Sequence, residues 1–426
     1  MERALYNAYV KILEEELVPA MGCTEPIAVA YAAALARQAL GQLPETVEIH
    51  VSANIIKNVK SVVVPHTGGL RGIGAAAAAG IIAGDAQREL EVLAHVTEEQ
   101  ITRMRDYLAA TPISIVPSDN GFIFDIQIRT AAGAHTAFAQ ISGGHTNLIR
   151  LEKDGEILFS KPYAEGGQVE RTDRALLSVE NIVAFADCVA VEDVRAVLDR
   201  QIQCNTTIAQ EGLRAGWGAN VGRVLLNAYG DTPHNRAKAL AAAASDARMS
   251  GCELPVVINS GSGNQGLTAS LPVIAYAEAT GSTEERLYRA LVVSNLCTIH
   301  LKTGIGKLSA YCGATSAGCG AGAGIAYLLG GGTYEVAHTI VNALAIDSGI
   351  ICDGAKSSCA AKIASAVEAG LLGMEMYRHG SQFYGGDGIV TKGVENTIKN
   401  VGRLAKYGMA PTDKEIIDIM ISEPNS

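Results

Sequence analysis

Aromatic side chains are scarce in this sequence, and their scarcity limits how a core can be built. They make up 5% of the 426 residues, with a single tryptophan, Trp217. Hydrophobic residues still amount to 48%, mostly Ala, Val, Ile and Leu, and there are 46 glycines. A chain of this length can bury a substantial core. We therefore expect closely packed helices built from small residues.

The sequence also lacks a basic excess, a signal-peptide pattern and an uninterrupted apolar run. Lys and Arg number 34 against 44 Asp and Glu, a net charge of −10, which argues against nucleic acid and anionic membranes as partners. Acidic residues are spread through the first 20 positions without a basic-then-apolar order, so secretion is not expected. Residues 308–334 are uncharged but contain Gly, Ser, Thr and two Cys, which favours a buried segment over a membrane span.

Periodicity predicts an α+β fold with two parts. In residues 1–165 we expect helices over about 2–17, 27–40 and 97–109. Two β-rich segments, VEIHVSA and SVVVP, lie on either side of residues 54–58. Further strands are expected at ISIV, FIFDIQIRT, HTAFAQIS, NLIRLEKDG and EILFS. A polar link follows, and residues 174–426 are dominated by helices joined by Gly-rich loops. We expect an α+β part with a small mixed sheet and a mainly helical part.

Nine cysteines, an odd number without a signal peptide, indicate reduced thiols in a cytoplasm. Four of them form two pairs with a spacing of seven, Cys312 with Cys319 and Cys352 with Cys359. Seven residues along a helix span about 10 Å, which is too long for one tetrahedral zinc ion. A larger cluster fits better, or a pair with Cys352 in a loop and Cys359 in the first turns of a helix. The alternative is that these small side chains only fill space.

Cys23 follows a loop and precedes Thr24, Glu25 and Pro26, which are typical of a helix start. A thiol at a helix N-terminus has a lowered pKa and can act as nucleophile, base or metal ligand. The alternative is a small buried residue near a helix cap.

Small and polar residues gather in the run NSGSGNQG at 259–266, between an apolar strand-like segment and a helix. Such a run can bind a carboxylate or phosphate through backbone N–H groups, or can be only a tight turn. His66 and His145 lie in Gly-rich loops and are either catalytic or simply solvated. Arg248, two positions after Asp246, either reads an anion or forms a surface charge pair.

Six motifs together resemble the bacterial and archaeal L-cysteine desulfidase family, and they follow the family's order over nearly the whole chain. They are GCTEP (22–26), GGHTN (143–147), SDARM (245–249), NSGSGNQG (259–266), LSAYCGAT (308–315) and ICDGAKSSCA (351–360). The resemblance implies a 4Fe-4S enzyme that converts L-cysteine to pyruvate, ammonia and sulfide, and that is related to the iron-sulfur L-serine dehydratases. It also implies that three cysteines, Cys312, Cys352 and Cys359, hold the cluster, whereas Cys319 is structural.

The chemistry requires a base at Cα, a Lewis acid at the leaving sulfur and a carboxylate site. We assign the carboxylate to the residues around Ser260, Ser262, Asn264 and Gln265. Cys23 is our first choice of base, with Lys57 or His145 as reserves, although Cys23 could instead bind iron. The alternatives are an iron-sulfur serine or threonine dehydratase and a non-enzymatic metal or amino-acid binding protein. Whether the chain forms a homo-oligomer is left open.

Overall fold

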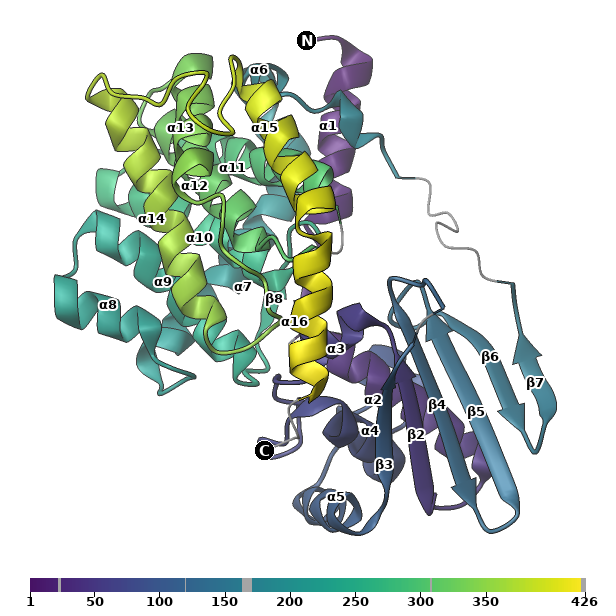
Figure 1. The fold of residues 1–426 in the computed structure, drawn as a ribbon. Coiled ribbons are helices and arrows are strands. Elements are labelled where there is room, and N and C mark those ends of the chain that lie inside the picture. Colours follow the sequence, from purple (N-terminus) through teal and green to yellow (C-terminus); the bar gives the residue numbers. More distant parts are fainter. Residues whose placement is uncertain (22–23, 119, 163–170, 307–308, 423–426) are drawn as a thin grey trace.

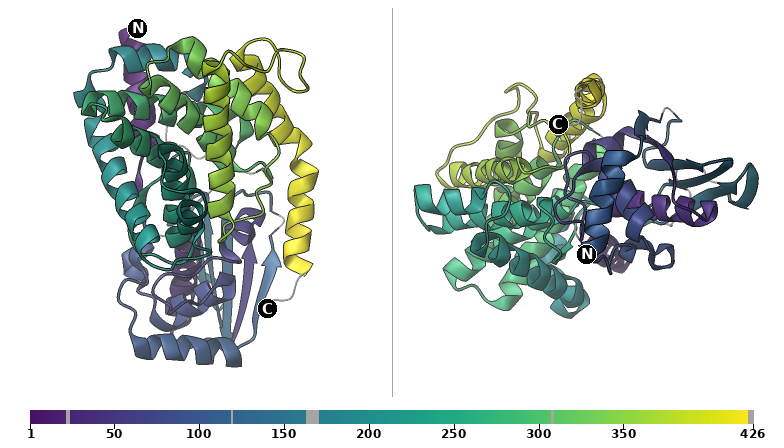
Figure 2. Two further views of the ribbon diagram at one scale, coloured as in Figure 1. Left: turned by 90° about the vertical axis from the view of Figure 1, so that its left-hand side faces the viewer. Right: turned by 90° about the horizontal axis from the view of Figure 1, so that it is seen from below.

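The computed structural model describes residues 1–21, 24–118, 120–162, 171–306 and 309–422. Within them the chain is mostly helical, with a small mixed sheet of six strands in the N-terminal part and a helical C-terminal region (Figure 1). The predicted α+β fold class is confirmed. Figure 2 shows the helical region and the sheet region arranged end to end, with the last helix running along one side of both. No described helix combines the length and hydropathy needed to cross a bilayer.

The six-stranded sheet has the order β3-β2-β4-β5-β6-β7, in which only β2 and β3 run parallel. Its strands are β2 (Thr46–Val51), β3 (Ile113–Pro117), β4 (Asp125–Ala132), β5 (His135–Ser142), β6 (Leu148–Lys153) and β7 (Glu156–Ser160). Buried and open positions alternate along β2, as expected of a sheet with one covered face. That face packs against α2 (Thr24–Leu40), which in turn packs against α4 (Gly72–Ala83).

Four further helical segments belong to the N-terminal part or to the link that follows it. They are α3 (Ala53–Val59), the 3₁₀ helix η1 (Ala86–Glu91), α5 (Glu98–Ala110) and the 3₁₀ helix η2 (Arg174–Leu176). One expectation for this region is wrong, because residues 54–58 lie in α3 and SVVVP forms no strand. SVVVP forms only an isolated bridge, between Val63 and Arg71, with flanking hydrogen bonds from the Val64 N–H to Leu70 and from the Gly72 N–H to Val62, and its valines are buried.

The helical region is built around α12 (Gly313–Leu328), which packs against α10, α11, α13 and α14. Its other elements are α6 (Val179–Cys188), α7 (Val191–Arg214), α8 (Val221–Tyr229), α9 (Pro233–Met249), α10 (Gly263–Thr280), α11 (Glu284–Ile305), α13 (Thr333–Ile346), α14 (Cys359–Arg378), α15 (Val394–Arg403), the π-helix η3 (Leu404–Gly408) and α16 (Ala410–Ser422). A Cβ at Gly318 would lie 2.2 Å from the carbonyl oxygen of Ala366, so α12 and α14 touch through their backbones. Small residues thus allow the close packing that the composition predicts.

The first helix, α1 (Arg3–Glu16), contributes to the same hydrophobic core as the later helices. After it, the short strand β1 (Pro19–Met21) pairs antiparallel with β8 (Pro255–Val257), and the Ile258 N–H donates to the Val18 carbonyl at 3.0 Å. The end of α1 therefore lies beside the start of the NSGSGNQG segment. The proposed division into residues 1–165 and 174–426 stays a prediction.

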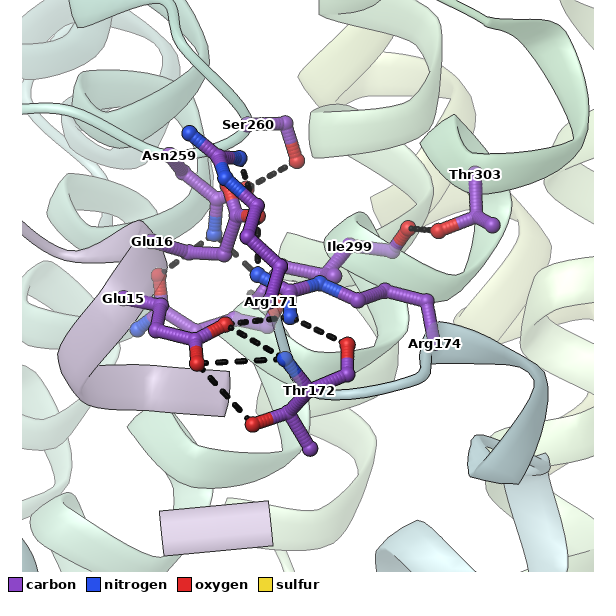
Figure 3. A network of polar contacts seen from close by, with 10 residues as sticks. Glu15, Glu16, Arg171, Thr172, Arg174, Asn259, Ser260, Ile299 and Thr303 are labelled. Carbon is purple, nitrogen blue, oxygen red and sulfur yellow. Dashed lines mark hydrogen bonds and ion pairs between the residues drawn. The ribbon is translucent and has the colours of Figure 1, made fainter. Parts of the chain in front are cut away.

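Two carboxylates at the end of α1 anchor the segment that leads into the helical region (Figure 3). Arg174 donates to Glu15 and, at 2.5 Å, to Glu16, while the Thr172 N–H donates to Glu15 at 3.2 Å. Arg171 pairs with Glu16 at 3.4 Å. Because Glu16 and Arg174 are both largely buried, these bonds fix where the chain enters η2.

Candidate functional site

Three cysteines lie near the start of α12: Cys312 and Cys352 in two loops, and Cys359 at the start of α14. An antiparallel bridge joins Tyr311 to Ile351, with the Cys312 N–H donating to Ile350 at 3.0 Å and the Cys352 N–H donating to Ala310 at 2.6 Å. The thiols of Cys312 and Cys352 are hydrogen-bonded to each other. Cys312 directly precedes α12, and Cys352 lies in the loop before α14, as the sequence predicts.

Cys359 is the first residue of α14, and its thiol lies 3.6 Å from the Gly354 carbonyl oxygen. The loop between Cys352 and Cys359 is held by Asp353, which pairs with Lys356 at 2.5 Å and also with Lys362. The charges of Cys352 and Cys359 act on each other. These three thiols are therefore the candidates to hold a metal group.

Positive charge surrounds these thiols. The hydrogen bond from Cys312 lowers the pKa of the Cys352 thiol, and the charges of Lys57 and Lys302 lower it further. Sharing that bond raises the pKa of Cys312, and burial raises the pKa of Cys359. Burial lowers the pKa of Lys302, against the pull of the nearby thiolates. These surroundings thus favour at least one thiolate, the form in which cysteine binds metals.

Lys57 brings α3 and α16 to the cysteine loop. Its side chain is 5% exposed, and its Nζ lies 2.5 Å from Oδ1 of Asp413 in α16. Its carbonyl oxygen accepts from the Ala355 N–H at 3.1 Å. A Cβ at Gly354, whose φ is +94°, would lie 2.1 Å from this oxygen, so only glycine fits. The N-terminal part and the cysteine loop are thereby in direct contact beside α16 (Figure 1).

The first half of NSGSGNQG forms a tight turn. The N–H groups of Asn259 and Ser262 donate to each other's carbonyls at 3.1 and 3.0 Å, and φ is +51° at Ser260 and +77° at Gly261. Two central residues with positive φ close a two-residue hairpin of type I′. The Ser260 hydroxyl donates to Asn259 at 2.8 Å, and Figure 3 shows this pair. Ser262 then precedes α10 as its N-cap.

The second half of the same segment begins α10 and contacts two other elements. Arg248, at the end of α9, donates to Oδ1 of Asn264 at 3.3 Å. Its Nε lies so close to Gly263 that a Cβ at this position would be only 2.3 Å from it. Gln265 lies against Gly313, where a Cβ would be 2.7 Å from its amide carbon. Gly313 is the residue after Cys312. The polar segment and the cysteines therefore lie next to each other.

Of the two alternatives for Arg248, the surface charge pair with Asp246 is wrong. Asp246 accepts instead from the N–H groups of Ala219 and Val221, at 3.2 and 2.6 Å, and so caps the start of α8. Burial raises the pKa of Asp246, and these N–H groups oppose the shift. Both side chains are buried, so they do not form a surface charge pair.

The structure links His145 to Glu25, in the first turn of α2. Its ring packs edge-on against Phe124, with centroids 4.8 Å apart. Burial lowers the pKa of His145, while the charge of Glu25 opposes the shift. Within the described ranges, Nε2 of His145 has no hydrogen-bond partner. Cys23, the residue before α2, lies outside the described residues.

Sequence reasoning missed two charged residues near the thiols, Lys302 and Asp413. Lys302 lies in the last turn of α11 and Asp413 in the first turn of α16, and no local signal marks either residue. Cys319 is 1% exposed inside α12, and the ionisable groups that act on it are Asp347 and Cys297. Its assignment as structural stays a prediction.

Comparison with known proteins relates most of the chain to one protein family. Residues 87–418 match the family described as serine dehydratase alpha chain. A UPF0597 protein of Desulfitobacterium hafniense is 60% identical over 421 residues, covering 99% of this chain and 98% of that protein. UPF0597 proteins of Lachnoclostridium phytofermentans and Treponema denticola are 50% and 46% identical, covering 98% and 99% of this chain and 100% of each relative. The chain therefore belongs to the serine dehydratase alpha chain family, in company with the UPF0597 proteins.

Proposed function

We propose that this protein is an iron-sulfur lyase that eliminates sulfide from L-cysteine, giving pyruvate, ammonia and hydrogen sulfide. One observation carries the proposal: the thiols of Cys312 and Cys352 are hydrogen-bonded to each other beside Lys57 and Lys302, within the electrostatic reach of Cys359 and next to the start of α10. A dehydratase family and a thiol-lined site together fit an elimination reaction at an amino acid.

The donor set suits an iron-sulfur cluster better than a single metal ion. Among the described residues, no three His, Cys, Asp or Glu side chains converge closely enough to hold one ion. Iron-sulfur clusters are held by cysteine thiolates on separate irons, so their ligands lie farther apart than those of zinc. Cys312, Cys352 and Cys359 would hold a 4Fe-4S cluster. When bound, the cluster would supply Lewis acidity toward the substrate sulfur.

The chain's own residues would bind the substrate and move one proton. The first turn of α10 presents N–H groups that have no partner within the helix, and these attract a carboxylate. Lys57 and Lys302 stabilise negative charge near the thiols. Lys57 is paired with Asp413, which suits it to electrostatic support more than to proton abstraction.

We keep Cys23 as our first choice of base at Cα. His145 is the reserve, and burial lowers its pKa, which favours the neutral imidazole that a base requires. Aminoacrylate released after the elimination would tautomerise to the imine, and one water molecule would hydrolyse the imine to pyruvate and ammonia without further catalysis.

A serine or threonine dehydratase is the second candidate, and the family match is the observation that favours it. In that reaction hydroxide replaces sulfide as the leaving group at the same site. The relation to the family holds for either substrate.

A side-by-side assay tests the proposal. Anaerobically purified protein is given L-cysteine, L-serine or L-threonine, and sulfide, pyruvate and 2-oxobutyrate are measured. We expect equal amounts of sulfide and pyruvate from L-cysteine. Turnover of L-serine or L-threonine without turnover of L-cysteine would show that the protein is a dehydratase and would contradict the proposed desulfidase activity.

A further inference from the structure

Arg248 is a buried cation whose only hydrogen bond found among the described residues goes to a neutral side chain. It is 9% exposed, and it donates to Oδ1 of Asn264 at a long 3.3 Å. Within the described part of the chain, its Nε is buried and has no partner. Buried charges are normally paired, because an unpaired charge is costly to remove from water. Among the described residues no carboxylate pairs with this guanidinium, so an anion bound there would balance its charge.

The guanidinium lies at the start of α10. Gly263 is the first residue of this helix, and a Cβ there would lie 2.3 Å from Nε and 2.7 Å from Cζ of Arg248. The N–H groups of a helix's first turn have no intrahelical acceptor and lie at the positive end of the helix dipole. Glycine at 263 lets the guanidinium reach those N–H groups. A fork of donors and a helix start on the same spot match a carboxylate.

Gln265 connects this spot to the thiols. It is 5% exposed, and its Oε1 is buried without a hydrogen-bond partner in the described ranges. Its amide lies against Gly313, the residue that follows Cys312. Gly263 and Gln265 are two positions apart on one helix, so their Cα atoms are separated by about 5.4 Å. This separation is on the scale of a three-carbon amino acid, and Oε1 of Gln265 can accept from an ammonium group.

We propose that Arg248 and the first turn of α10 bind the free α-carboxylate of the substrate, and that Gln265 receives its α-ammonium group. The inference rests on the proposed function in one respect: the lyase reaction requires that the β-substituent of the substrate point toward the thiols. It names a substrate class, free α-amino acids, and excludes their amides and esters.

The test measures binding and turnover separately, on anaerobically reconstituted protein of full length. L-Alanine, which has no leaving group, is titrated by calorimetry and compared with L-alaninamide. Michaelis constants for L-cysteine are measured in parallel. The variants are Arg248→Gln and Asn264→Asp, with Arg236→Gln as the control because Arg236 lies on the same helix, is 44% exposed and pairs with Asp231.

Arg248→Gln should raise the dissociation constant of L-alanine and the KM of L-cysteine about 10- to 100-fold, the range expected for a charge-assisted hydrogen bond. Asn264→Asp supplies a resident carboxylate, so it should weaken binding similarly while leaving the melting temperature unchanged or higher. This second variant keeps the test valid if Arg248→Gln does not fold. Arg236→Gln should leave the dissociation constant and the KM unchanged. L-Alaninamide should not bind to the wild-type protein.

The outcomes separate this inference from the proposed function. L-Cysteine turnover that is within twofold of wild type in both variants would overturn the carboxylate site and leave the lyase standing. L-Alanine binding that depends on Arg248, in a protein that turns over neither L-cysteine nor L-serine, would support the site and overturn the lyase. Absence of both binding and turnover in the wild type would overturn both.

Discussion

Replacing Asp413 with Asn tests how α16 is held against α3. The substitution keeps the size of the side chain but removes its charge, so Lys57, only 5% exposed, is left beside a neutral partner. Breaking a buried ion pair from one side costs about 3–5 kcal/mol, whereas an exposed pair contributes about 0–1 kcal/mol. Asp413 is 17% exposed, which places this pair between the two limits. We expect a loss of about 2 kcal/mol.

The loss should appear as local opening of α16. This helix packs mainly on α3 and η3, at the edge of the molecule, so it can detach without unfolding the core (Figure 2). A change of about 2 kcal/mol corresponds to about 30-fold in an opening equilibrium. Amide hydrogen exchange over residues 410–422, followed by mass spectrometry, should accelerate by that factor.

Asp418→Asn is the matched control, since it makes the same substitution at an exposed position of the same helix. It should leave exchange over residues 410–422 close to that of the wild type. If the Asp413→Asn and Asp418→Asn variants show equal rates of amide hydrogen exchange over residues 410–422, the ion pair with Lys57 does not hold α16. Our assignment of this contact would then be wrong.

Two further predictions concern stability. Hydrogen bonds from His234 and Lys238 lower the pKa of Glu368 from 4.5 to about 2, so this carboxylate contributes stability above about pH 4.5 that is lost as the pH falls toward 2. Glu368→Gln should therefore lower the melting temperature at pH 7 and flatten its fall between pH 5 and 2. Gly354→Ala should lower the melting temperature more than Gly386→Ala, because both have positive φ but only the Cβ at 354 meets the Lys57 carbonyl. Equal shifts in the two glycine variants would contradict the close contact.

The sequence predicts much of the fold because local patterns decide it. Alternation along residues 135–142 predicts β5 with the bounds that the structure shows. The loop that separates Cys352 from α14 is likewise predicted, since Asp353 and Gly354 interrupt the helical pattern. SVVVP misleads because three consecutive valines favour a strand, whereas here they are buried and their pairing is limited to the isolated bridge between Val63 and Arg71.

The site is only partly predictable, because its contacts join residues far apart in the chain. Spacing alone leaves the cysteines open to a packing explanation, and the structure brings Cys312 to Cys352 through a bridge between two loops. No local pattern places Gln265 against Gly313 or Lys57 against Asp413. The local sequence indicates these contacts only through Gly263 and Gly313. Gly263 leaves room for the Arg248 side chain, and Gly313 leaves room for the Gln265 side chain.

Iron and acid-labile sulfide per chain, measured on anaerobically purified protein, test most directly the claim that these three thiols hold a cluster. We expect about four irons and four sulfides per chain and a brown colour that is lost in air. Cys352→Ser should abolish both contents, whereas Cys319→Ser should leave them largely intact. A colourless or zinc-bearing wild-type protein that still folds, or equal iron in the two variants, would contradict the account and favour a non-enzymatic binding protein or a different ligand set.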